Sequence, residues 1–168
     1  MKETVKQYVG RIRGYVAGRD PLRVQQATPG RIRKLVRRLP ARKLKRRPAP
    51  GKWSIAEILA HLAECELVAG YRIRMILSAP GTKIQSFDQD AWAKVGRYRN
   101  LGAHHCLEMF ATLREHNLAL LRSLKPRQWK QYGMHQERGK ESVARIAEMF
   151  AGHDLNHLKQ IEKLAGRK

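Results

Sequence analysis

Two histidines lie four residues apart near the end of the sequence, in the segment MFAGHDLNHLKQI. Residues at positions i and i+4 of a helix project from one face, so His153 and His157 could direct both imidazoles at one metal ion. In a chain with seven histidines such a pair also arises by chance, and packing in the core is the alternative. A third ligand on another helix would favour the metal site.

His61 is the candidate for that third ligand. It lies in WSIAEILAHLAECELVAGYRIRMIL, which has helical periodicity, on the edge of the apolar stripe that it shares with Cys65 and Arg72. Burying three imidazoles together is unfavourable unless something holds them neutral, and a divalent cation does so by taking their lone pairs. Three histidine ligands leave a coordination position open, which is typical of catalytic metal sites.

Several other polar residues have both a functional and a structural interpretation. Glu64 follows His61 by three residues and could act as a general base, or it could be a solvated carboxylate. Cys65 could add a soft ligand, but a cysteine on an apolar stripe is more often a small packed residue. Arg72 and Arg114 could bind a substrate carboxylate or phosphate, although surface ion pairing is favoured for each.

The other polar and aromatic candidates have weaker signals. Asp154 and Asn156 point away from the neighbouring histidines on a helix, and both are left unassigned. We expect the large aromatic residues near turns to anchor the connection after the His61 helix against the bundle. These aromatic residues are Trp53, Phe87 and Trp92. The remaining histidines are expected at the surface or in hydrogen bonds, with His135 as a residue that could line a pocket mouth; the others are His104, His105 and His116.

Helical periodicity dominates the chain, and no segment has a strand pattern. A basic amphipathic helix is predicted up to Gly18, and a second is predicted to begin with Thr28 as N-cap and Pro29 in its first turn. Ser54 and Glu57 form a capping box before the third helix. Two more helices are predicted, over 103–124 and from about Ser142, after a long connection with one short helix. The fold class is therefore all-α, a four-helix bundle.

The net charge of +21 is concentrated in the first third of the chain, where residues 1–52 hold seventeen Lys or Arg and only two acidic residues. Such a segment could bind nucleic acid or another anionic surface nonspecifically, or it could be solvated without a partner. The two cysteines lack CxxC spacing, so a reducing, cytoplasmic environment is expected. No segment approaches the roughly 20 apolar residues of a membrane span, so no membrane partner is expected.

The segments GKWSIAEILAHLAECELVAGYRIRMIL, PGTKIQSFDQDAWA and HQERGKESVARIAEMFAGHDLNHLKQI resemble the DinB/YfiT-like family. The resemblance extends from about GRDPLRVQQATP to HLKQIEKL. The length predicts one domain over 1–168, with 1–20 as a basic helical extension. The resemblance implies a long crossover between bundle helices 2 and 3. It also implies a homodimer and a metal triad of His61, His153 and His157. The metal would be zinc or nickel, although iron or manganese would also suit three imidazoles.

Two functions of different kinds follow. The first is a divalent-metal-dependent enzyme of the hydrolase or thiol-dependent transferase type, acting on an unknown small molecule, with Glu64 as the candidate catalytic base. The alternative is a basic protein that binds nucleic acid or an anionic surface, in which the metal site is structural or vestigial. The sequence carries no signature of a particular substrate.

Overall fold

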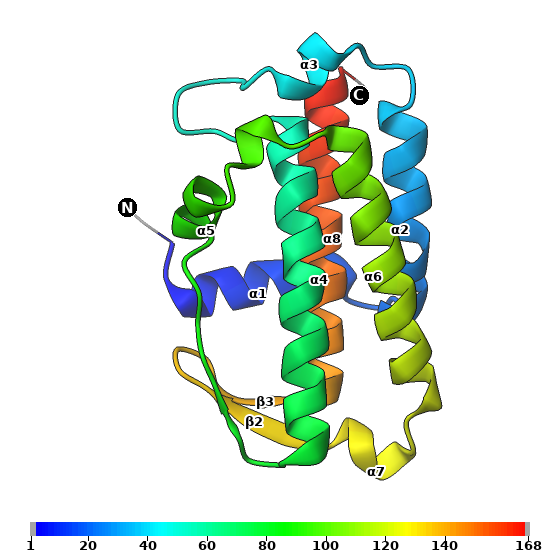
Figure 1. Ribbon diagram of the computed structural model, residues 1–168. Helices are drawn as coiled ribbons and strands as arrows, with labels where there is room; N and C mark the ends of the chain where they lie inside the picture. Colours follow the sequence, from blue (N-terminus) through cyan, green and yellow to red (C-terminus); the bar gives the residue numbers. More distant parts are fainter. Residues whose placement is uncertain (1–2, 167–168) are drawn as a thin grey trace.

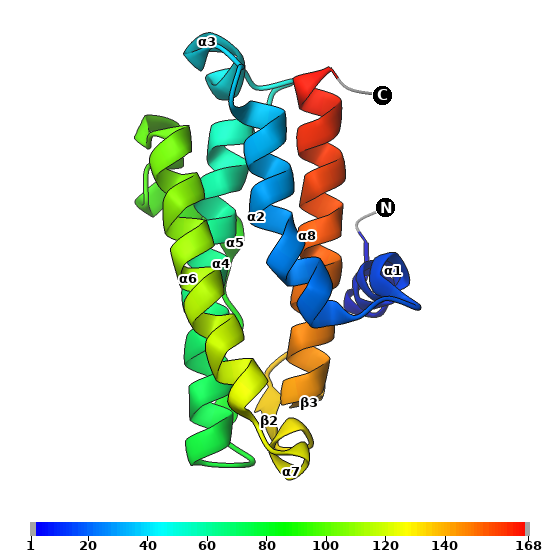
Figure 2. The same ribbon diagram turned by 90° about the vertical axis from the view of Figure 1, so that its right-hand side faces the viewer.

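A computed structural model describes residues 3–166, and four long helices form its bundle (Figure 1). Helices α4 and α6 run in one direction and α2 and α8 run in the other (Figures 1 and 2). The most extensive packing joins α4 to α6 and α2 to α8. Their bounds are α2 Pro21–Val36, α4 Ile55–Ser78, α6 Ala103–Ser123 and α8 Val143–Ala165. The predicted four-helix bundle is confirmed.

The predicted starts of the two histidine-bearing helices are confirmed by their caps. Ser54 Oγ accepts a hydrogen bond from the Glu57 backbone N–H, and the Glu57 carboxylate accepts one from the Ser54 backbone N–H, which completes the capping box of α4. Ser142 Oγ accepts from the Arg145 backbone N–H at the start of α8. These local bonds satisfy N–H groups that a helix terminus otherwise leaves unpaired.

The predicted start of the second helix of the chain, which is the first helix of the bundle, is wrong. Helix α2 begins eight residues earlier, at Pro21. Asp20 acts as its N-cap, because its carboxylate accepts hydrogen bonds from the backbone N–H groups of Leu22 and Arg23. Thr28 lies inside the helix and donates its hydroxyl proton to the Val24 carbonyl at 2.9 Å. Pro29 lacks the N–H that would donate to the Gln25 carbonyl in a regular helix. The side chain of Arg114 in α6 donates to that carbonyl instead.

Between α4 and α6 the chain makes the long crossover, which returns it to the end of the bundle where α4 began (Figure 1). This connection contains the expected short helix, α5, and two further pieces. They are β1 Lys83–Ile84, α5 Gln89–Val95 and the 3₁₀ turn η1 Tyr98–Asn100. Because α4 and α6 are parallel neighbours, the chain needs a connection of this length between them.

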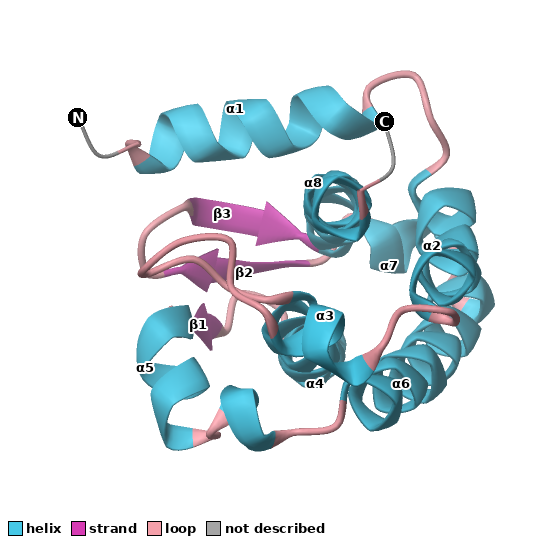
Figure 3. Cartoon of the chain, turned by 90° about the horizontal axis from the view of Figure 1, so that it is seen from above, coloured by secondary structure: helices cyan, strands magenta, loops and turns pink. Residues whose placement is uncertain are grey.

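Short elements complete the chain, and three of them overturn the prediction that it contains no strand. Strands β1, β2 and β3 form a small sheet in that order, with β1 parallel and β3 antiparallel to β2 (Figure 3). Strands of two to four residues are too short to show alternation in the sequence. The remaining bounds are α3 Ala41–Lys45, α7 Pro126–Trp129, β2 Tyr132–His135 and β3 Gly139–Ser142.

Helix α1, Val5–Val16, is the basic helix predicted at the start of the chain, and it lies across α8 (Figure 3). Its buried residues Ile12 and Val16 face the bundle. Gly152 allows close approach, because a Cβ there would lie 2.1 Å from the Ile12 carbonyl oxygen. Residues 1–2 of the predicted extension and residues 167–168 lie outside the described residues. Within the described residues, no helix is both long and apolar enough to cross a membrane.

Candidate metal centre

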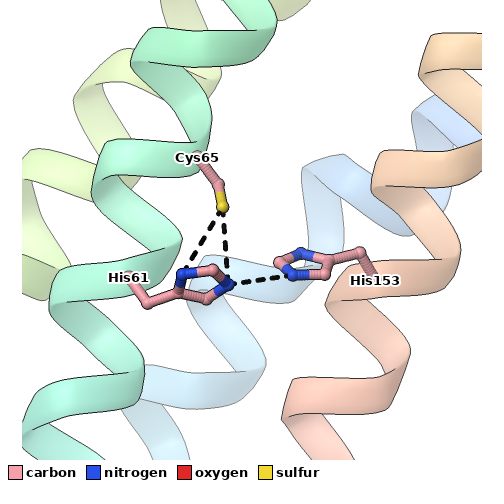
Figure 4. Close-up of side chains that lie close together, drawn as sticks. All are labelled: His61, Cys65 and His153. Atoms are coloured by element: carbon pink, nitrogen blue, oxygen red, sulfur yellow. Dashed lines mark hydrogen bonds between the residues drawn. The ribbon is translucent and has the colours of Figure 1, made fainter. Parts of the chain in front are cut away.

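The bundle brings His61 of α4 together with His153 and His157 of α8. The Nε2 atom of His153 lies 3.0 Å from Nε2 of His61 and 3.0 Å from Nε2 of His157. The rings of His61 and His157 have their centroids 5.0 Å apart. Figure 4 shows His61 and His153 facing each other across the space between the two helices. Three ring nitrogens therefore converge on one region of the interior.

Burial keeps these imidazoles neutral at physiological pH. It lowers the pKa of His61 to about 3, with a smaller contribution from His157, and it lowers the pKa of His157 to about 4. Burial is also the main reason why the pKa of His153 falls well below its usual value, with the neighbouring imidazoles adding to the effect. Neutral rings keep a lone pair available for a ligand.

A neighbouring amide defines how His157 presents its lone pair. The Nδ1 atom of His157 lies 2.9 Å from Oε1 of Gln160, one turn further along α8. Because an amide oxygen only accepts hydrogen bonds, Nδ1 carries the proton and Nε2 points its lone pair at the cluster. The buried Nδ1 of His153, in contrast, has no partner among the described residues.

The donor set suits a divalent transition metal. Two ring nitrogens bound about 2.1 Å from one ion at right or tetrahedral angles lie about 3.0–3.4 Å apart. The observed separations of 3.0 Å agree with that range. His61, Cys65 and His153 also offer ligand atoms within 4.8 Å of one another. Imidazole nitrogens with one nearby sulfur are typical ligands of zinc and related metals.

Cys65 lies beside His61, as Figure 4 shows. Its Sγ is 3.5 Å from Nε2 and 3.7 Å from Nδ1 of His61, and only 6% of the residue is exposed. Burial, followed by the nearby carboxylates of Glu66 and Asp154, raises the pKa of this thiol. The chain by itself therefore holds Cys65 as a neutral thiol packed against the imidazole.

The structure places Glu64 toward the crossover. Its carboxylate accepts a hydrogen bond from the Tyr98 hydroxyl of η1, and burial together with this bond raises the pKa of Tyr98. Among the described residues, no hydrogen bond joins Glu64 to the three imidazoles. Its predicted role as a general base stays a prediction.

Arg114 lies in the core, so the favoured prediction of a surface ion pair is wrong. Its guanidinium donates to Glu66 Oε1 at 2.8 Å, to Asp154 Oδ1 at 3.0 Å and to the Gln25 carbonyl at 2.8 Å. The last bond replaces the helical bond that Pro29 cannot make. Asp154, which the sequence left unassigned, is therefore part of a buried ion network that joins α2, α4, α6 and α8.

Arg72 is also buried, and its predicted surface position is wrong as well. Its Nη2 donates to the Gln85 carbonyl of the crossover at 2.6 Å, and its guanidinium lies over the Phe87 ring. Burial lowers the pKa of Arg72. These contacts attach the crossover to α4. Asn156, the other unassigned residue, accepts a hydrogen bond from Arg11 of α1.

The remaining candidates are three aromatic residues and four histidines. Trp53 packs its ring 4.9 Å from that of His61, and Phe87 packs 4.8 Å from Trp92, measured between ring centroids. His135 is buried, and its Nδ1 accepts hydrogen bonds from the backbone N–H groups of Glu137 and Arg138. The other three histidines, His104, His105 and His116, are exposed. The sequence indicated Trp53 as an anchor but gave no signal for its contact with a candidate ligand.

Comparisons with known proteins agree with this architecture. Residues 26–161 match the sequence model of the DinB superfamily. OB0782 and OB0413 of Oceanobacillus iheyensis, both named as candidate metal-dependent hydrolases, are 28% identical over 70% of this chain and 29% identical over 67% of it. The matches span 68% and 64% of those proteins.

YfiT of Bacillus subtilis, which carries the same kind of name, is 22% identical over 87% of this chain and 83% of its own. The solved structure of YfiT, described as a four-helix bundle of unusual topology, superposes with a TM-score of 0.78 at 17% identity, over 99% of this chain and 92% of that one. This likeness shows the fold. Because the superfamily match covers most of its length, the chain belongs to the DinB superfamily.

Proposed function

We propose that this protein is a divalent-metal-dependent hydrolase that holds its ion on His61, His153 and His157. The observation that carries the proposal is the convergence of the Nε2 atoms of three neutral imidazoles. Nε2 of His153 lies 3.0 Å from Nε2 of each of the other two. The names of the relatives from Oceanobacillus iheyensis and Bacillus subtilis support hydrolysis over thiol transfer. Three imidazoles suit zinc or nickel.

The protein's own residues would perform defined tasks in such a site. Gln160 would hold the proton of His157 on Nδ1 and so keep Nε2 unprotonated. Trp53 covers one side of the His61 ring and limits the access of water there. When bound, the ion would supply Lewis-acid polarisation of a substrate oxygen. Glu64 is the proposed proton acceptor, and Tyr98 would hold its carboxylate in place until substrate arrives.

Elemental analysis of protein purified without a metal-affinity tag tests the site. Wild type should carry about one transition-metal ion per chain, and His61→Ala and His153→Ala should each remove it, since three histidine ligands become two. His104→Ala, which changes an exposed histidine, is the matched control and should retain the ion. A wild type that binds no stoichiometric metal after reconstitution would refute the proposal.

The alternative function, binding of nucleic acid or an anionic surface through the basic first third, has a separate test. Affinity for a double-stranded DNA oligonucleotide should be measured from low to physiological salt. Nonspecific phosphate contacts weaken steeply with salt, whereas a dedicated binding protein retains affinity near physiological salt. Retained DNA binding together with an absence of stoichiometric metal would favour this alternative over the hydrolase.

A further inference from the structure

We propose that a cavity beside α5 binds a small phosphorylated molecule. The cavity has a volume of about 540 Å³ and lies between the segment that joins α3 to α4 and the α5–η1 segment. A volume of this size is typical of pockets for small molecules. Its cationic lining consists of Arg47, Lys94, Arg97 and Arg99.

The charge of the lining is not balanced within the protein. Of the two acidic residues on the wall, Glu57 is already engaged by Arg47 and by the Ser54 cap, so Asp90 alone faces the remaining cations. Within residues 3–166, no ion pair or side-chain hydrogen bond engages Lys94, Arg97 or Arg99. Three cations against the single carboxylate of Asp90 leave an excess of two positive charges around this concave space, which favours a ligand with more than one negative charge.

The backbone conformation of Arg97 supports a role for its side chain. Arg97 has φ 48° and ψ 46°, and it is the one non-glycine residue with positive φ in the described part of the chain. Glycine would adopt this left-handed conformation more readily, so an arginine here is unfavourable for the backbone. The Asn100 N–H donates to the Arg97 carbonyl at 2.8 Å and helps to hold the turn. Residues held in this conformation cluster at active sites and ligand-binding sites.

Trp53 gives the cavity an aromatic wall on the side of the histidine cluster. It lines the cavity, and its ring packs 4.9 Å from that of His61. A ligand whose phosphates contact the arginines could therefore rest an apolar or ring-shaped part against the indole. The charged side chains that define this pocket are separate from the histidines, so the proposal does not require a metal ion.

Calorimetric titration with inorganic pyrophosphate at about physiological salt tests the pocket. Wild type should bind with saturation, and Arg97→Gly and Arg99→Gln should each weaken the affinity about tenfold, because each removes a charge-assisted contact. Arg97→Gly keeps the left-handed backbone without strain, so a loss of affinity cannot be attributed to a distorted turn. If Arg97→Gly does not fold, Arg99→Gln in η1 carries the test.

Two controls locate the binding. Arg122→Gln removes an exposed cation from the last turn of α6, at the opposite end of that helix from η1, and should leave the affinity unchanged. His153→Ala should also leave it unchanged. The proposal is overturned if wild type shows no saturable binding, if Arg122→Gln weakens it as much as Arg97→Gly, or if His153→Ala abolishes it. Binding of duplex DNA without binding of pyrophosphate would also overturn it, in favour of a nucleic-acid surface.

Discussion

Gln160 illustrates how an exposed residue can control a buried one. It lies outside the histidine cluster, yet its amide oxygen, 2.9 Å from Nδ1 of His157, determines which ring nitrogen carries the proton. Partners of this kind typically change metal affinity by about 10–100-fold when removed. The proposed site therefore depends on a residue that offers no ligand.

Gln160→Ala should weaken metal affinity about tenfold and leave the free energy of unfolding of the metal-free protein nearly unchanged, because the residue is exposed. Gln160→Glu, which keeps an acceptor oxygen one turn from His157, is the matched control and should retain the affinity. Competition with a chromophoric chelator measures both variants. Equal affinities in Gln160→Ala and wild type would show that this hydrogen bond does not position His157.

At the scale of helices, α1 is fixed to the bundle through a glycine. Gly152→Ala would place a methyl group 2.1 Å from the backbone oxygen of Ile12, and neither backbone can yield without separating α1 from α8. We expect this change to lower the free energy of unfolding by about 1–3 kcal/mol, measured by urea denaturation.

Gly30→Ala is the control, because a Cβ at Gly30 in α2 meets nothing within 4 Å. Alanine is favoured over glycine in a helix interior, so this variant should gain about 0.5–1 kcal/mol. The difference between the two variants isolates the contact with α1. If Gly152→Ala is as stable as Gly30→Ala, α1 does not pack against α8 as described.

The buried ion network joins the four bundle helices, and Arg114 is its only cation among the described residues. Arg114→Leu would leave Glu66 and Asp154 buried without their partner and should lower the free energy of unfolding by about 3–5 kcal/mol. Arg122→Leu, an exposed change on the same helix, should stay within about 0.5 kcal/mol of wild type in the same urea experiment. A small effect of Arg114→Leu would mean that water reaches the carboxylates.

Over the whole molecule, four histidines whose pKa values are lowered predict a free energy of unfolding that falls with acid. His61, His135 and His157 have pKa values of about 3, 4 and 4, and that of His153 is also lowered, so the folded chain stays neutral at these positions while the unfolded chain takes up protons. The free energy of unfolding is therefore retained above about pH 6.5 and lost as the pH falls toward 4.

Metal-free protein should lose on the order of 1–2 kcal/mol for each of these histidines between pH 7 and pH 5 in urea denaturation. Asp154 opposes this trend, because burial raises its pKa to about 6 and the folded state gains a proton there first. Because one carboxyl opposes four imidazoles, the free energy of unfolding still falls as the pH is lowered. A flat profile over this pH range would show that the imidazoles are open to solvent and titrate normally.

The sequence by itself determined the bundle and the candidate ligands, because both depend on local spacing. Apolar residues at helical intervals, the capping box before α4 and the Ser142 cap of α8 act within a few residues of the chain. Periodicity assigned the histidines to faces of two helices, and the resemblance to the DinB/YfiT-like family joined them into one candidate triad. The predicted bundle and superfamily are confirmed.

Only the tertiary structure decided which polar side chains meet in the interior. Arg114 and Asp154 are 40 residues apart in the chain, and neither has a local pattern that distinguishes a buried ion pair from a solvated charge. The strands were too short to alternate visibly, and the Gln25 carbonyl that Pro29 frees is satisfied by Arg114 from another helix. The cavity around Arg97 likewise forms from segments about 50 residues apart, so its charges cluster only after folding.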